Sequence, residues 1–200
     1  MKKFSTITTL IAGSLAMAAC GETATQTDEV GDADTMANSD AEATKPITEA
    51  EVEAAQQAWG EGIVDIGKTF TDEGDYRARA QKHIADHYAY GDDQTILFKP
   101  TLAAEDQFRE NDAEALSYFV GTEGTEDGGF AIAPYSAVRW ENNGTVISDS
   151  GDMAVAMGNY YFTGANNEET KVEYSFAYER GEDGKLDIVL HHSSLPYSAQ

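Results

Sequence analysis

The sequence predicts an α+β domain in which helices pack on one face of a curved sheet. Two observations carry this prediction. Apolar residues recur at helical spacing through the first half of the segment 47–200, and apolar and polar residues alternate in strand fashion after residue 136. A glycine-rich stretch, GTEGTEDGG, separates the two halves. Helices followed by a meander of strands are typical of α+β domains with an antiparallel sheet.

Residues 1–20 predict a secretory signal rather than part of this domain. The basic start MKK precedes an apolar run that is short for a membrane span and ends in small residues. Ala18-Ala19-Cys20 resembles a bacterial lipobox, with Met17 where leucine is usual, and Cys20 is the only cysteine in the chain. We therefore expect a lipoprotein anchored through Cys20 on the periplasmic side of the cell envelope, with Gly21 favouring the outer membrane. Cleavage near Ala19 of an ordinary signal peptide is the alternative.

Residues 21–46 are rich in Ala, Thr, Asp and Glu and contain no aromatic residue, so we expect a disordered acidic tether. The net charge of −23 argues against nucleic acid as a partner and against electrostatic docking to anionic lipid. Any membrane attachment would therefore come from the N-terminal lipid alone. A folded part without cysteine also excludes disulfides and thiolate zinc sites.

The domain at 47–200 begins with a predicted long helix. Thr48 and Glu51 form a capping-box signature. One apolar helical face follows, made by Val52, Ala55, Trp59, Ile63 and Ile66. A second helix is predicted over about 75–88 and a short strand over 95–101, with Pro100 indicating a strand end or a sheet edge. One or two helices follow over 102–120, with Asn111 or Asp112 as an internal cap.

Four strands are predicted over 136–149, 152–164, 171–180 and 185–194, with a hairpin turn at Asn143-Gly144. Along the last strand, strict alternation places two sets of side chains on opposite faces: Leu186, Ile188, Leu190, His192 and Ser194 on one, Asp187, Val189, His191 and Ser193 on the other. His191 and Ser193 are then neighbours on one face. They either form a hydrogen-bonded strand end or line a pocket.

Metal and nucleophile motifs are weak in this sequence. His83 and His87 lie four residues apart on one helical face, but the glutamate of an HExxH motif is absent. His191 and His192 point to opposite faces and cannot easily hold one ion, so a three-histidine site requires the second helix to meet the last strand. A G-x-S-x-G elbow, a P-loop and a dinucleotide fingerprint are absent. A polar pocket of hydroxyl and phenol groups remains.

Four stretches together resemble the iota-class carbonic anhydrases: ILFKPTLAAEDQFR, ALSYFVG, AMGNYYFT with VEYSFAY, and LHHSSLPYS. This class is related to the association domain of calcium/calmodulin-dependent kinase II, in the nuclear-transport-factor-two-like superfamily. The resemblance covers about residues 47–197. It implies a cone-shaped α+β fold, with a curved antiparallel sheet wrapped around a long N-terminal helix, and a homodimer. It also implies reversible hydration of carbon dioxide to bicarbonate without a metal or other cofactor.

The same resemblance implies that Thr101, Tyr118 and Ser193 surround the bicarbonate, with His191 as a supporting residue. Hydroxyl groups can both accept from water and donate to bicarbonate. Because histidine ordinarily titrates nearer neutral pH than tyrosine, we expect Tyr118 to orient the substrate or share a proton, and His191 or solvent to accept it. The alternatives are a non-enzymatic ligand-binding or self-association module, a manganese- or zinc-dependent anhydrase, and an isomerase or dehydratase of the same superfamily.

Overall fold

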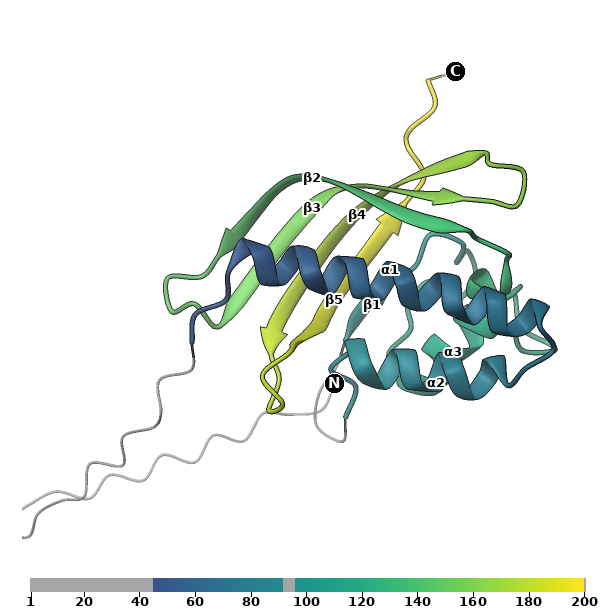
Figure 1. Ribbon diagram of the computed structural model, residues 1–200, viewed down its shortest axis with the longest axis horizontal. Coiled ribbons are helices and arrows are strands. Elements are labelled where there is room, and N and C mark those ends of the chain that lie inside the picture. Colours follow the sequence, from purple (N-terminus) through teal and green to yellow (C-terminus); the bar gives the residue numbers. More distant parts are fainter. Residues whose placement is uncertain (1–44, 92–95, 200) are drawn as a thin grey trace, which may run out of the picture. The chain divides into compact units, whose positions relative to one another are not determined.

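A computed structural model of the protein describes residues 45–91 and 96–199 (Figure 1). The predicted signal, Cys20 and the tether up to residue 44 lie outside the described residues. The elements, in chain order, are α1 (Glu49–Thr71), α2 (Tyr76–His87), β1 (Leu97–Lys99), α3 (Asp112–Val120), the short 3₁₀ helix η1 (Phe130–Ile132), β2 (Ala137–Ile147), β3 (Met153–Thr163), β4 (Glu169–Arg180) and β5 (Leu186–Ser194). Within the described residues no helix is long and apolar enough to cross a membrane.

One five-stranded sheet has the order β1-β5-β4-β3-β2; helix α1 lies across one of its faces, and α2 packs beside α1 (Figure 1). Strands β2 to β5 form the predicted antiparallel meander. The expectation of a wholly antiparallel sheet is wrong, because β1 pairs with β5 in parallel. Pro100 follows this edge strand directly, as its missing N–H requires.

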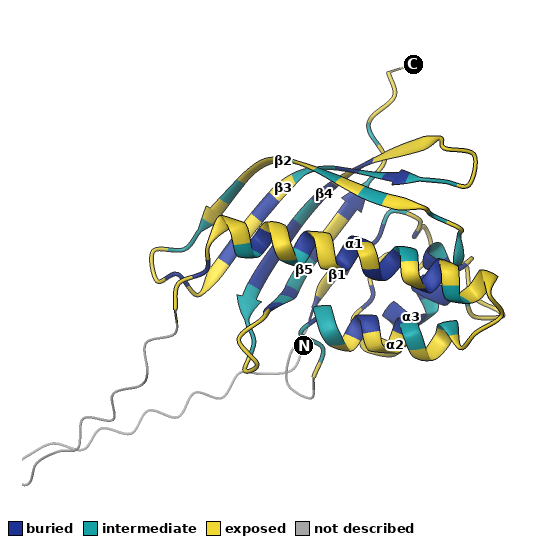
Figure 2. Cartoon of the chain, in the orientation of Figure 1, coloured by how far each residue is buried: buried dark blue, intermediate teal, exposed yellow. Residues whose placement is uncertain are grey.

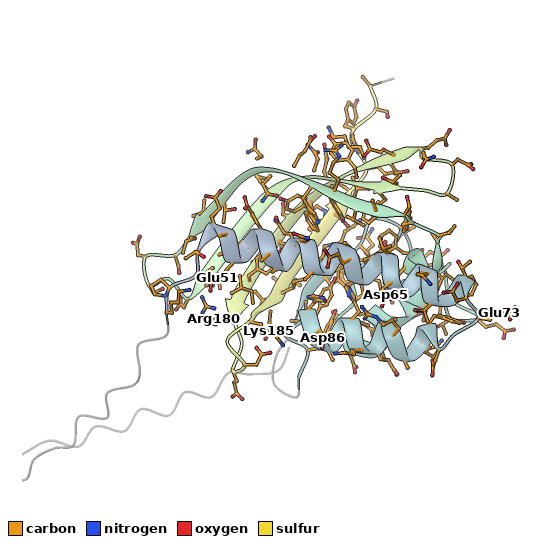
Figure 3. The ribbon with its side chains drawn as sticks, in the orientation of Figure 1. Glu51, Asp65, Glu73, Asp86, Arg180 and Lys185 are labelled. Carbon is orange, nitrogen blue, oxygen red and sulfur yellow. The ribbon has the colours of Figure 1, made fainter. Side chains whose placement is uncertain are left out.

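Helix α1 begins with the predicted capping box. The Thr48 backbone N–H donates to the Glu51 carboxylate at 2.9 Å, and the Glu51 N–H donates to the Thr48 hydroxyl at 3.3 Å. Arg180 at the end of β4 also donates to Glu51, at 3.2 Å (Figure 3), and this contact first, with the Thr48 hydroxyl next, lowers the pKa of Glu51 to about 2. The side of α1 that faces the sheet is buried and its other side is exposed (Figure 2). Each large side chain buried there contributes about 1.5–3 kcal/mol.

The predicted hairpin turn at Asn143-Gly144 is wrong. Strand β2 continues through this pair, with a shift of register between Asn142 and Gly144 that marks a β-bulge. The chain reverses instead at 148–152, where the Ser148 N–H donates to the Met153 carbonyl. The backbone of the bulge lies close to Gly158 of β3, where a Cβ would be only 2.2 Å from the Glu141 carbonyl oxygen. The bulge accommodates the Asn-Gly pair inside the strand, and the strand pairs with β3 on both sides of it.

A second bulge corrects the alternation predicted for β5. Ala177 of β4 pairs with Leu190 and Tyr178 pairs with Ile188, which leaves Val189 as an extra residue. Ile188 and His191 are therefore both buried, although strict alternation places them on opposite faces. Beyond the bulge the predicted alternation holds: His191 and Ser193 are buried on the inner face, and His192 is exposed. The bulge reverses which residues of β5 point inward after Val189. The buried face of β5 therefore ends in the polar side chains of His191 and Ser193.

Candidate active site

A cavity of about 70 Å³ lies inside the domain, between helices α1 and α3 and the inner face of the sheet. Thr101, Tyr118, His191 and Ser193 all line it, so the structure brings the four predicted site residues together. Aromatic side chains including Trp59 and residues 119, 130 and 162 form much of the remaining wall. A larger hollow of about 790 Å³ beside α1 and β2 is open to solvent, whereas the small cavity is lined by the buried polar side chains of His191 and Ser193.

The hydroxyls of Thr101 and Ser193 are directly hydrogen-bonded, with 2.9 Å between the oxygens. Thr101 follows the end of β1, and Ser193 lies near the end of β5. The parallel pairing of β1 with β5 places these two strand ends side by side, with Lys99 opposite His192. Two residues 92 positions apart thus present adjacent hydroxyls to the cavity.

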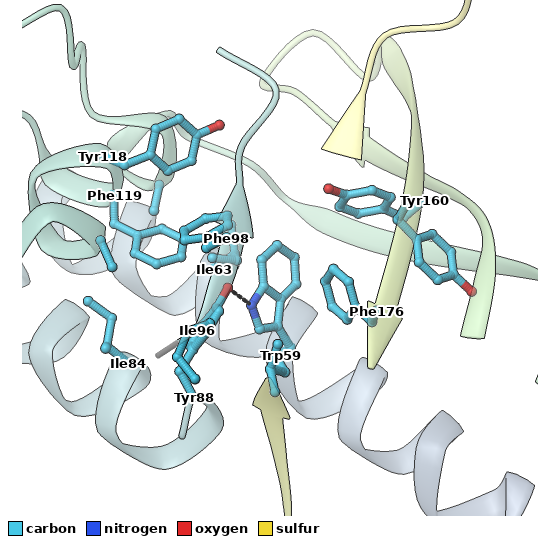
Figure 4. Close-up of a cluster of buried hydrophobic side chains, with 14 of the residues drawn as sticks. Trp59, Ile63, Ile84, Tyr88, Ile96, Phe98, Tyr118, Phe119, Tyr160 and Phe176 are labelled. Carbon is cyan, nitrogen blue, oxygen red and sulfur yellow. Dashed lines mark hydrogen bonds between the residues drawn. The ribbon is translucent and has the colours of Figure 1, made fainter. Parts of the chain in front are cut away.

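Tyr118 and Tyr160 approach the same space from opposite walls. Tyr118 comes from α3 and its ring stacks on Phe130, with 5.5 Å between centroids. Tyr160 comes from β3 and is 2 % exposed. Their hydroxyls point toward the space between them (Figure 4). Sequence reasoning missed Tyr160: its place in a strand pattern was visible, but nothing distinguished it among ten tyrosines.

His191 lies in a cage of aromatic rings at the floor of the cavity. Its ring stacks on Phe98 at 4.5 Å between centroids and contacts Phe176 at 4.0 Å. Its Nδ1 atom is 2.9 Å from the Tyr88 hydroxyl, and its Nε2 atom is 3.5 Å from the Tyr160 hydroxyl. Burial first, and then the nearby His192, lowers the pKa of His191 well below its usual value. The imidazole is therefore neutral at pH 7.

The phenols of the cavity also remain uncharged. Burial raises the pKa of Tyr118, although an interaction with the Leu102 backbone opposes the shift. Burial likewise raises the pKa of Tyr160, against the opposing influence of Ser193 and Thr101. The cavity is thus small, neutral and rich in groups that can donate a hydrogen bond. Such a site suits a small molecule with an apolar carbon and acceptor oxygens.

Known proteins resemble this chain over the whole domain. The family model for metal-independent carbonic anhydrases matches residues 50–195. The chain belongs to this family. The metal-independent carbonic anhydrase of Nostoc sp. (strain PCC 7120 / SAG 25.82 / UTEX 2576) is 42 % identical over 158 residues, which cover 76 % of each chain. The resemblance to carbonic anhydrases predicted from the four sequence stretches is confirmed.

Solved structures agree with this assignment. A cyanobacterial iota-carbonic anhydrase, crystallised with bicarbonate, superimposes with a TM-score of 0.73 at 40 % identity, covering 77 % of this chain and 95 % of the other. A calcium/calmodulin-dependent protein kinase II association domain from Xanthomonas campestris gives a TM-score of 0.50 at 22 % identity, covering 78 % and 98 %, and shows the shared fold. The predicted α+β fold is thus confirmed for this carbonic anhydrase.

A buried ion pair ties the loop 101–111 of this carbonic anhydrase to α3. Arg109 donates to Asp127 at 2.5 Å, and their side chains are only 2 % and 5 % exposed. Ser117, next to Tyr118 in α3, donates to the same carboxylate at 2.6 Å. The loop replaces part of the helix predicted over 102–120; only α3 forms there, capped by Asn111 as expected. Sequence reasoning missed the ion pair, because nothing local marks Arg109 as buried.

The two helical histidines of the carbonic anhydrase do not join the cavity. His83 is fully buried and its ring centroid is 4.6 Å from that of His87. Among residues 45–91 and 96–199, no group of three or more His, Cys, Asp or Glu side chains is arranged to hold a metal. Burial lowers the pKa of His83 well below its usual value and that of His87 to about 4. Both imidazoles are therefore neutral; His83 packs inside the core, and His87 is half-buried beside it.

Proposed function

We propose that this carbonic anhydrase hydrates carbon dioxide in the cavity formed by Thr101, Tyr118 and Ser193. The observation that carries the proposal is the pair of bonded hydroxyls in a neutral cavity of about 70 Å³. One water takes up about 30 Å³ of liquid volume, so the cavity has room for about two waters or for one small molecule of similar volume. Carbon dioxide and bicarbonate have that size.

The reaction forms one bond between a water oxygen and the carbon of carbon dioxide. One C=O electron pair becomes a lone pair on a bicarbonate oxygen, and the water loses a proton. The hydroxyls of Thr101 and Ser193 can hold the attacking water and donate to the oxygen on which charge develops. Tyr118 can donate to a second oxygen and fix the orientation of the substrate. Preorganised donors in a dry site stabilise such a charge more than water does.

The proton from the water leaves to solvent in this proposal. His191, Tyr118 and Tyr160 are all neutral at pH 7, and the lowered pKa of His191 makes it a weak base. The sequence left two proton acceptors open, His191 and solvent. The lowered pKa of His191 favours solvent. Hydroxyl groups can pass the proton outward because each both accepts and donates.

A stopped-flow assay of carbon dioxide hydration tests the proposal. Thr101→Val should lower kcat/KM about 10²-fold, as expected for the loss of one preorganised donor. Thr101→Ser should restore most of it. Activity that survives a strong chelator in protein with no bound metal supports this mechanism over a manganese or zinc site. Activity lost with the chelator would contradict it, and so would activity indifferent to Thr101, which a pure binding module predicts.

We also propose that the protein forms a homodimer through the outer face of its sheet. One apolar row crosses all five strands there: Val146, Val155, Ala177, Leu190 and Leu97. Val146, Leu97 and Val155 are 72 %, 63 % and 44 % exposed. The five strands hold 46 residues in all, and strand rise and spacing give this face an area of about 730 Å², close to the roughly 800 Å² per partner that a stable interface buries.

A second copy fits this face because it presents the same apolar row, whereas two chains of charge −23 repel each other elsewhere. Sedimentation equilibrium should show a dimer. Val155→Asp should give a monomer, and Phe70→Asp, which changes an exposed apolar side chain on the helical side, should leave the dimer intact. A dimer that persists in Val155→Asp would contradict the proposal.

We propose, finally, that Cys20 carries a lipid that anchors the protein on the periplasmic side of the outer membrane. The support is the lipobox-like sequence and the lone cysteine at its end. Mass spectrometry of the mature N-terminus should show a diacylated cysteine, and Cys20→Ser should move the protein to the soluble periplasmic fraction. An unmodified N-terminus at Cys20 or near Ala19 would contradict the proposal.

A further inference from the structure

A chain of buried polar groups leads from helix α1 to the cavity. The Trp59 Nε1 atom is 3.0 Å from the Tyr88 hydroxyl, which is 2.9 Å from His191 Nδ1 (Figure 4 shows the first contact). His191 Nε2 in turn lies 3.5 Å from the Tyr160 hydroxyl. The four residues come from α1, the end of α2, β5 and β3. All four are at most 3 % exposed, so water does not compete for these bonds.

Elementary donor and acceptor rules give this chain a direction. An indole N–H can only donate, so the Tyr88 oxygen accepts from Trp59. If His191 Nδ1 also carried a proton, the Tyr88 hydroxyl proton would have no acceptor among residues 45–91 and 96–199. A buried donor without an acceptor is costly. Tyr88 therefore donates to Nδ1, and the single proton of the neutral imidazole lies on Nε2.

The direction continues into the cavity. With its proton on Nε2, His191 can only donate to the Tyr160 hydroxyl on that side. Tyr160 then accepts from His191 and turns its own proton away from it, toward the cavity that Thr101 and Ser193 also line. The aromatic cage around His191 fixes the plane of the imidazole, with Phe98 stacked at an interplanar angle of 15°.

We propose that Trp59, Tyr88 and His191 form a one-way hydrogen-bond chain that aims the Tyr160 hydroxyl into the cavity as a further donor to the substrate oxyanion. The proposal rests on the proposed function of this cavity and deepens it. Of the four residues in this chain, Tyr160 is the catalytic one, because its hydroxyl faces the cavity that holds the substrate. Trp59, Tyr88 and His191 are positioning residues, and His191 acts as a fixed donor rather than as a base.

The tautomer of His191 is the direct test, and it needs no turnover. In the full-length protein labelled with ¹⁵N-histidine, long-range ¹⁵N–¹H correlation spectra distinguish the two neutral tautomers and the cation. The signal that disappears in His191→Gln identifies His191. We expect a neutral ring with its proton on Nε2 from pH 6 to 8. Tyr88→Phe should shift the Nδ1 resonance, because it removes the donor. A proton on Nδ1, or a charged ring in this range, would overturn the proposal.

Activity gives a second, independent test. Tyr160→Phe should lower kcat/KM about 10²-fold, as for one preorganised donor. Tyr178→Phe is the matched control: it removes the hydroxyl of another buried tyrosine, on the neighbouring strand, that does not line the cavity, and it should stay within about twofold. Equal effects of the two changes would overturn the proposal.

Two substitutions of His191 distinguish its role as a hydrogen-bond donor from a role as a base. The amide of His191→Gln can keep a donor near the position of Nε2 but cannot titrate, whereas His191→Leu keeps neither function. We expect the Gln variant to remain within about tenfold of the parent with an unchanged pH profile, and the Leu variant to fall about 10²-fold. A folded Gln variant as inactive as Leu would overturn the donor role. Failure of the proposed function would abolish the activity differences and leave the tautomer result intact, so the two failures are distinguishable.

Discussion

Removal of the Ser193 hydroxyl is the sharpest perturbation of the proposed mechanism. Ser193 is 3 % exposed, and its oxygen accepts from Thr101 at 2.9 Å. In Ser193→Ala the Thr101 hydroxyl loses this acceptor inside the protein, which should cost about 1–3 kcal/mol of unfolding free energy. Loss of one preorganised donor should lower kcat about 10²–10³-fold, equivalent to about 2.7–4 kcal/mol of transition-state stabilisation. The change leaves the aromatic walls of the cavity untouched.

Ser194→Ala is the matched control for this change. Ser194 is the next residue of β5, faces the other side of the sheet and contacts Glu173 at 3.4 Å. The two variants should differ by at least about 10²-fold in stopped-flow carbon dioxide hydration, while urea unfolding shows that both are folded. The double variant Thr101→Val with Ser193→Ala should be little worse than either single change, because the two hydroxyls act as a unit. Parental activity in Ser193→Ala, or fully additive losses in the double variant, would contradict a catalytic role for the two hydroxyls.

Three further predictions concern stability and can be read from urea unfolding. Gly62→Ala would place a Cβ 2.2 Å from Nδ1 of the buried His83 and should lower the free energy of unfolding by about 1–3 kcal/mol. Gly128→Ala, which has open space around it, should lower it by less than about 1 kcal/mol. Equal losses in the two variants would contradict close packing of Gly62 against His83. Arg109→Met leaves Asp127 buried without its partner and should cost about 3–5 kcal/mol, and the added change Asp127→Leu should recover part of that; no recovery would argue against a buried ion pair. The folded protein lowers the pKa of three histidines below the unfolded value of about 6.5: His83, His87 and His191. The stability that they contribute is therefore complete above about pH 6.5. As the pH drops toward 4, the free energy of unfolding should fall by about 1 kcal/mol per histidine per pH unit. His87→Gln should remove about one third of that slope, and an unchanged slope would show that His87 is not neutral in the folded protein.

Local patterns in the sequence predict most of the helices and strands and part of the site. Helical spacing from Val52 to Ile66 and alternation in the last four strands are local patterns, and each follows from which side chains must be buried. Side-chain alternation alone also placed His191 and Ser193 on one face. The resemblance of four stretches to a known family supplied Thr101 and Tyr118 as their neighbours.

The way in which these parts meet depends on pairing and packing between distant segments. The bulges at Asn143 and Val189 depend on pairing between strands, so no local pattern could place them. The parallel pairing of β1 with β5 joins Thr101 to Ser193 across the sequence. Tyr160 and the chain from Trp59 to His191 arise from four separate elements, and their directional bonding follows from burial that excludes water. Thr101, Tyr118 and Ser193 could be named from the sequence, whereas Tyr160 and the direction of the hydrogen bonds depend on contacts that exist only in the folded domain.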